Sequence, residues 1–206
     1  MHNYRKILGV VIALVVTLTA ACQPIQAVPA QTQGAAAATQ DDATIAAKIE
    51  MAMRAAGPAI SKDATIMDWP AAPGGEFVVL REGANRWTCF PPETYMPEGV
   101  AHPMCMDEVW LAFMKARYAH EELPAVTTPG IAYMLDGGGT ASISDPFARE
   151  PAAGQAWIKN APPHMMVLTP GDLSGYSHKP GPEPWVMYAD TSFAHLMLAI
   201  PMPEKQ

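Results

Sequence analysis

Proline is so frequent in this chain that it restricts the fold mostly to short helices and strands. The chain has 21 prolines in 206 residues, and all but Pro24 and Pro29, 19 in number, lie at or after Pro58. Proline has no backbone N–H to donate and breaks the interior of a helix. Beyond Pro58 we therefore expect one long helix, ending before Pro124, with short strands, turns and loops making up the rest.

The first residues predict export. Arg5 and Lys6 form a basic region, and residues 7–18 are an apolar run with the length of a signal peptide, too short for a spanning helix with these flanks. Small residues then lead to Cys22, an arrangement that resembles the bacterial lipoprotein signal, in which the Cys becomes the lipidated first residue. That pattern has Leu three places before the Cys, whereas this chain has Thr19 there.

Cleavage without a lipid, after Ala27 or Ala30, is the alternative to lipidation. In either case residues 1–21 are a processed segment. Residues 22–40 hold the lipidated Cys22 and an uncharged stretch of mostly Ala, Gln and Pro, which predicts a flexible tether. Residues 41–206 are long enough for a single globular domain with its own core. We therefore expect a cell-envelope protein held at the membrane through an N-terminal lipid, with soluble periplasmic or secreted protein as the alternative.

The negative charge of the chain argues against polyanionic partners. The net charge is −7, and loss of Arg5 and Lys6 with residues 1–21 leaves −9. An acidic surface argues against nucleic acid and against adhesion to anionic lipid. The identity of a small-molecule or protein partner stays open.

The cysteines predict one disulfide. With Cys22 assigned to the processing site, only Cys89 and Cys105 are left in a protein exported to an oxidising compartment. Closing a loop of this size contributes about 3 kcal/mol to stability through the unfolded state. The chain has no C-x-x-C sequence, which argues against a thioredoxin-like redox role.

Hydrophobic periodicity predicts an α+β domain built on an antiparallel sheet of about six strands, with two principal helices and the disulfide. One helix covers residues 42–56 with Asp42 as its N-cap, and the other begins after Asp107. A hairpin is predicted from residues 76–82 and 86–90, which are separated by a three-residue link. The remaining strands are predicted at residues 130–135, 164–168, 185–188 and 195–200.

Several short sequence segments resemble those of a known family. "RWTCFP", "PMCMDEVW", "GIAYMLDGG", "SDPFA", "PHMM" and "YADTSFAHLMLAIP" resemble a family of small, exported, uncharacterised bacterial proteins, over most of the domain. The resemblance implies one exported domain with paired cysteines. It implies no activity, and no functional residue carries over from it.

One motif suggests chemistry. His-x-Met occurs three times, whereas random placement of 6 His and 14 Met in 206 residues (6 × 14 / 206) gives about 0.4 occurrences. Residues i and i+2 of a strand share a face, so two of the three pairs would present imidazole and thioether together. This ligand set suits copper, above all Cu(I). The candidate metal ligands are His102, Met104, His164, Met166, His195 and Met197.

Other interpretations compete with the metal site. Methionine is a common core filler, and a histidine at a strand start often only binds a carbonyl group, so all six residues can be ordinary core. Ser144 with Asp145, or Ser174 with His178, could be part of a hydrolase, but their spacing is that of ordinary turns. The sequence thus predicts a non-catalytic binding or structural domain of the envelope; a periplasmic copper-binding protein is the alternative, and a hydrolase is the second alternative.

Overall fold

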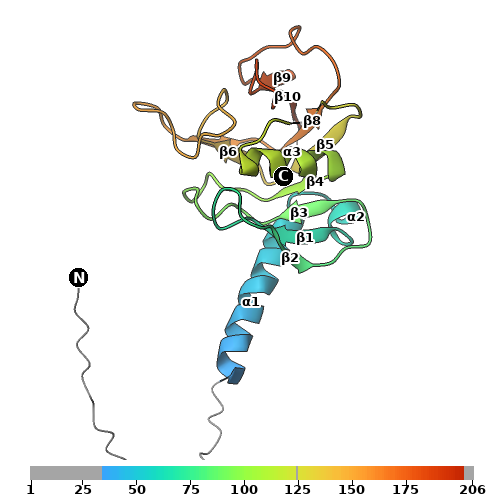
Figure 1. The fold of residues 1–206 in the computed structure, drawn as a ribbon, viewed down its shortest axis with the longest axis vertical. Coiled ribbons are helices and arrows are strands. Elements are labelled where there is room, and N and C mark those ends of the chain that lie inside the picture. Colours follow the sequence, from blue (N-terminus) through green and yellow to red (C-terminus); the bar gives the residue numbers. More distant parts are fainter. Residues whose placement is uncertain (1–33, 124, 202–206) are drawn as a thin grey trace, which may run out of the picture.

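The computed structural model describes residues 34–123 and 125–201, and within them the chain forms a mixed α/β fold (Figure 1). The helices are α1 (Gly34–Met53), α2 (Pro58–Ser61) and α3 (Glu108–Ala119). A large sheet contains β1 (Thr65–Asp68), β2 (Val78–Arg81), β3 (Thr88–Phe90), β4 (Met104–Met106), β5 (Gly130–Met134), β8 (His164–Leu168), β9 (Trp185–Met187) and β10 (His195–Ala199). A second, small sheet pairs β6 (Gly138–Thr140) with β7 (Ile158–Ala161).

The large sheet has the strand order β2-β1-β3-β4-β5-β8-β10-β9. All of its pairs are antiparallel except β1 with β3, which run parallel. The prediction of helices with a mainly antiparallel sheet is thus confirmed. The predicted number of strands is wrong, because the eight strands of this sheet include β1 and β4, which are only four and three residues long.

The predicted hairpin of residues 76–82 and 86–90 is also wrong. Both strands form, but β1 lies between them. The link turns back onto the start of β1: Ala84 N and Asn85 N donate to the carbonyl of Asp63 at 2.7 and 3.2 Å. A Cβ at Gly83 would lie 2.2 Å from Thr65 N, so only glycine permits this approach. The three-residue link therefore packs against a more distant part of the chain and does not form a local hairpin turn.

Helix α1 begins earlier than expected. It starts at Gly34, so Asp42 lies inside the helix and the predicted N-cap is wrong. Residues 34–40, assigned to the tether, belong to this helix, which fits the run of four alanines at residues 35–38, since alanine is the best helix former. The predicted signal peptide, Cys22 and the rest of the tether lie outside the described residues. Within residues 34–123 and 125–201, no helix is long and apolar enough to cross a membrane.

Helix α3 begins as the sequence predicts. The carboxylate of Asp107 accepts hydrogen bonds from Val109 N at 3.1 Å and Trp110 N at 3.0 Å, and its other oxygen accepts from Ile131 N of β5 at 2.9 Å. This N-cap therefore also ties the helix to the sheet. One face of the helix is apolar and buried, and it carries Trp110, Phe113, Met114 and Tyr118. The helix ends at His120, which adopts the left-handed conformation of a C-cap.

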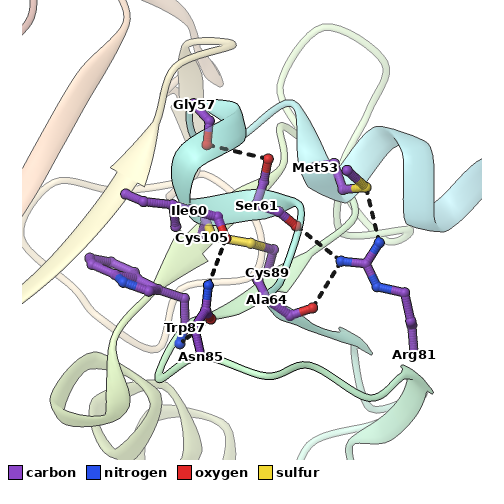
Figure 2. The surroundings of a disulfide bond; sticks show 10 residues. All are labelled: Met53, Gly57, Ile60, Ser61, Ala64, Arg81, Asn85, Trp87, Cys89 and Cys105. Atoms are coloured by element: carbon purple, nitrogen blue, oxygen red, sulfur yellow. Dashed lines mark hydrogen bonds between the residues drawn. A yellow bond between two sulfur atoms is a disulfide. The ribbon is translucent and has the colours of Figure 1, made fainter.

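The two faces of the sheet have separate cores, because successive strand residues point to opposite sides. Cys89 and Cys105 are paired directly across β3 and β4 and form the predicted disulfide, which is thereby confirmed. They pack with the end of α1 and with Ile66. Figure 2 shows the α2 segment held beside the disulfide by Arg81, whose guanidinium donates to the carbonyls of Ser61 and Ala64 at 3.0 and 2.9 Å. The opposite face carries α3 and the larger core.

Candidate functional site

A cavity of about 150 Å³ lies between α3 and the face of the sheet that α3 covers. Its walls come from α3, from β4, β5, β8, β9 and β10, and from the small sheet. Most of the lining is apolar, and methionine dominates it. Seven methionines line the cavity: Met96, Met104, Met114, Met134, Met166, Met187 and Met197.

Strand alternation places the His-x-Met pairs on the cavity side. In β8 the side chains of His164 and Met166 are buried, with 5% and 4% of their surface exposed, while the residue between them is half-buried. In β10 His195 and Met197 are 2% and 7% exposed, with the same alternation. The expectation that each strand presents its imidazole and its thioether on one face is therefore confirmed.

The third pair reaches the same cavity from the neighbouring segment. His102 precedes β4 and Met104 is its first residue, and both are half-buried. The cavity is lined by these two residues, by the pair of β8 and by the pair of β10. All six residues singled out from the sequence thus border one cavity, although they span 96 positions of the chain, from His102 to Met197.

The three histidines do not meet at one point. His164 is paired with Ala199, which lies four residues beyond His195 on β10. At about 3.4 Å per residue, this places the two histidines roughly 14 Å apart along the strand direction. Consistent with this, the described residues contain no group of three or more His, Cys, Asp or Glu side chains arranged to hold a metal.

Two histidines lie at the glycine turn that follows β5. A Cβ at Gly138 would lie 2.9 Å from Cε1 of His164 and 3.4 Å from Cε of Met134. A Cβ at Gly137 would lie 3.9 Å from Cε1 of His102. The absence of a side chain at these two positions leaves the room that the rings occupy. Burial lowers the pKa of His164, and the charge of the neighbouring His102 lowers it further.

Two backbone carbonyls fix the tautomers of the strand histidines. Nδ1 of His164 is 2.7 Å from the carbonyl oxygen of Pro162, and Nδ1 of His195 is 2.9 Å from that of Phe193. Because a carbonyl oxygen can only accept, Nδ1 carries the hydrogen in each ring and Nε2 carries the lone pair. A metal-binding histidine usually donates its other ring N–H to a backbone carbonyl or a carboxylate in this way.

His195 is the most deeply buried of the three. Burial lowers its pKa to about 4, and the charges of Arg117 and His164 act in the same direction, so the ring is neutral near pH 7. It sits among aromatic rings, with centroid distances of 4.9 Å to Trp110, 5.5 Å to Phe113 and 5.5 Å to Tyr188. Among the described residues, His195 and His102 are the ones with a buried side-chain atom, Nε2 in both, that lacks a hydrogen-bond partner.

Sequence reasoning missed a charged pair in the cavity wall. Glu93 is 8% exposed and accepts a hydrogen bond from the hydroxyl of Tyr118. The guanidinium of Arg117 lies 4.0 Å from the same carboxylate oxygen, and its Nε donates to the carbonyl of Pro146 at 2.6 Å. No local sequence pattern predicts that residues 93 and 117 come into contact. Met134 and Met187 were also missed; Met134 lies in a strand whose burial alternates, whereas β9, which holds Met187, shows no such alternation.

The serines considered for a hydrolase lie in exposed turns. Ser174 donates its hydroxyl to the carboxylate of Asp172 at 2.7 Å, and its backbone N–H bonds to the same side chain at 2.9 Å. Asp145 accepts the backbone N–H of Phe147 at 2.9 Å. Both are side-chain-to-backbone patterns of turns.

Comparison with known proteins gives no match: no protein-family model, curated protein or solved structure is significantly similar to this chain.

Proposed function

We propose that this protein is an exported, lipid-anchored protein of the bacterial cell envelope that binds Cu(I) in the cavity beneath α3. The observation that carries the proposal is that all three His-x-Met pairs border this one cavity. A core packed only for stability has no need to gather them, because the apolar part of each methionine could be supplied by leucine.

The available donors favour Cu(I) over other metals. Imidazole and thioether are the side-chain groups that suit this soft ion, whereas zinc sites in proteins are built from thiolates, imidazoles and carboxylates rather than thioethers. Cys89 and Cys105 are joined in the disulfide on the other face of the sheet and offer no thiolate. In His164 and His195 the lone pair of Nε2 is available for a metal, since Nδ1 carries the proton.

The cavity supports binding rather than hydrolysis. Among the described residues that line it, none is Ser, Cys or Asp. The three histidines border thioethers and aromatic rings, and the one carboxylate, that of Glu93, already accepts from Tyr118. Thr140 also lines the cavity, but its hydroxyl donates to the carbonyl of Ser142 at 2.9 Å, so the described contacts of the cavity include no nucleophile paired with a base, which hydrolysis by covalent catalysis needs.

Replacing cavity methionines by leucine is expected to weaken Cu(I) binding. Leucine has nearly the volume of methionine, so Met134→Leu with Met197→Leu removes two sulfur atoms from the cavity wall while keeping the packing. We expect the affinity for Cu(I) to fall about tenfold or more, the scale on which disturbing a metal site acts. Competition with a coloured Cu(I) chelator, in the metal-free purified protein, measures this.

Met106→Leu is the matched control. Met106 is fully buried in the same sheet but does not line the cavity, so its replacement should leave Cu(I) affinity unchanged. Wild-type binding no tighter than about micromolar, which corresponds to roughly 8 kcal/mol, would leave only the packing role. Equal weakening in Met106→Leu and in the double variant would place the metal elsewhere.

Cys22 supports the proposed anchor, because it follows an apolar run and small residues. Expressed in a bacterium with labelled palmitate, the wild-type chain should become labelled and partition with membranes. Cys22→Ser should abolish both, because serine offers no thiol for the lipid. No label in the wild type would favour cleavage after Ala27 or Ala30 instead, and label retained in Cys22→Ser would show that the lipid is not attached at Cys22.

A further inference from the structure

The two ends of the cavity carry different sets of soft ligands. We call His195, Met187 and Met197 the hairpin set, because they come from the hairpin of β9 and β10. We call His102, His164 and Met134 the turn set, because they surround Gly137 and Gly138. Both sets line the same cavity, and each contains at least one imidazole and one thioether.

The hairpin set is built by strand pairing. His195 lies directly opposite Met187 in the register of β9 and β10, and Met197 follows two residues later on the same face. Directly opposed residues have Cβ atoms about 5 Å apart, close enough for both side chains to reach one ion. The ring of His195 is 98% buried, and its Nε2 has no hydrogen-bond partner among the described residues. This nitrogen is the unexplained group at the hairpin end.

The turn set is built by strand pairing and by the glycines. Met134 lies directly opposite His164 in the register of β5 and β8. The thioether methyl of Met134 and the ring of His164 both come within 3.4 Å of the point where a Cβ of Gly138 would lie, so the two side chains are neighbours. His102 reaches the same turn beside Gly137, and its Nε2 is the other buried nitrogen without a partner among the described residues.

One ion cannot use both sets. A metal-bound nitrogen lies about 2 Å from its metal, so two imidazoles on one ion have nitrogens about 4 Å apart. The strand positions of His164 and His195 are separated by four residues of β10, which is roughly 14 Å. Side chains in a sheet stand roughly perpendicular to it, so the ring nitrogens keep most of this separation.

We infer that the cavity holds two separate Cu(I) sites, one at the hairpin set and one at the turn set. The inference rests on the proposed function and adds its stoichiometry and its ligands. The hairpin site supplies one imidazole and two thioethers, and the turn site supplies two imidazoles and one thioether. Met166 lies between them, opposite Ala132 on β5 and Met197 on β10, so the thioether lining is continuous from one end to the other.

Native mass spectrometry of the mature protein, with Cu(I) supplied as its acetonitrile complex under nitrogen, counts the bound ions. We expect two equivalents in the wild type and in Met106→Leu. His195→Phe combined with Met187→Leu should lose one equivalent and keep the other, because phenylalanine fits the aromatic surroundings of His195 but offers no lone pair. His164→Phe combined with Met134→Leu should also keep one.

The outcomes separate the inference from the function on which it rests. A single equivalent in the wild type, or the loss of all copper in either paired variant, would overturn the two sites while leaving a Cu(I) protein. No bound copper in the wild type would overturn both. If a phenylalanine variant fails to fold, the single variants Met187→Leu and Met134→Leu, which preserve volume, still test the inference. Each should weaken the binding of one of the two copper ions. If either variant weakened the binding of both ions, the sites would not be separate.

Discussion

Glu93→Ala is expected to lower the free energy of unfolding by about 3–5 kcal/mol, the cost of removing one partner from a buried ion pair. Glu93 is 8% exposed, and the side chain of Arg117 is 13% exposed. Alanine would leave the guanidinium with the carbonyl of Pro146 as its remaining hydrogen-bond partner among those described, and the hydroxyl of Tyr118 without its acceptor. Urea unfolding followed by circular dichroism measures the change.

Two further variants test the cause of this loss. Glu93→Gln keeps an acceptor for Tyr118 but removes the charge, so it should cost less than Glu93→Ala. Replacing both charges, as Glu93→Leu with Arg117→Met, should cost less than the sum of the two single changes, since neither variant side chain leaves a buried charge alone. Strict additivity, or a loss no larger than that of the exposed Glu121→Ala, would mean that the pair does not stabilise the fold.

Local signals predicted the elements whose sequence pattern is self-sufficient. Residues 164–168 alternate buried and half-buried side chains over the whole of β8. The start of α3 could be predicted because Asp107, a favourable N-cap residue, is followed at once by a helical apolar pattern. Strand β1 gave no such signal. It has four residues, and its position between β2 and β3 depends on contacts with the Gly83 turn and with Cys89. Pairing between distant segments is decided by the whole sheet.

The candidate site divides in the same way. His195 and Met197 lie on one face of the sheet because side chains in a strand alternate with a period of two residues, and this could be predicted from the sequence. The convergence of the three pairs depends on the strand order β4-β5-β8-β10-β9, which a single sequence does not reveal. The role of Gly138 could not be predicted either, because its missing side chain leaves room for the ring of His164, which lies 26 positions away in the chain.

Acidification should destabilise the metal-free protein through its buried histidines. Burial lowers the pKa of His195 from 6.5 to about 4, with Arg117 on α3 and His164 on β8 adding repulsion. Between these two pH values the unfolded chain takes up a proton at this residue and the folded protein does not, so unfolding becomes more favourable as the pH falls. Relative to the protein above pH 6.5, His195 should lower the free energy of unfolding by about 3 kcal/mol by pH 4. His164, whose pKa is also lowered, adds to the loss in the same direction.

The contribution of His195 can be isolated by comparing variants, since carboxylates also titrate in the lower part of this range. His195→Phe cannot take up a proton, so its stability should fall less between pH 7 and pH 4 than that of the wild type, by about 3 kcal/mol. His178→Gln, at an exposed position, should follow the wild-type curve. Parallel curves for His195→Phe and the wild type would show that His195 can be protonated within the fold.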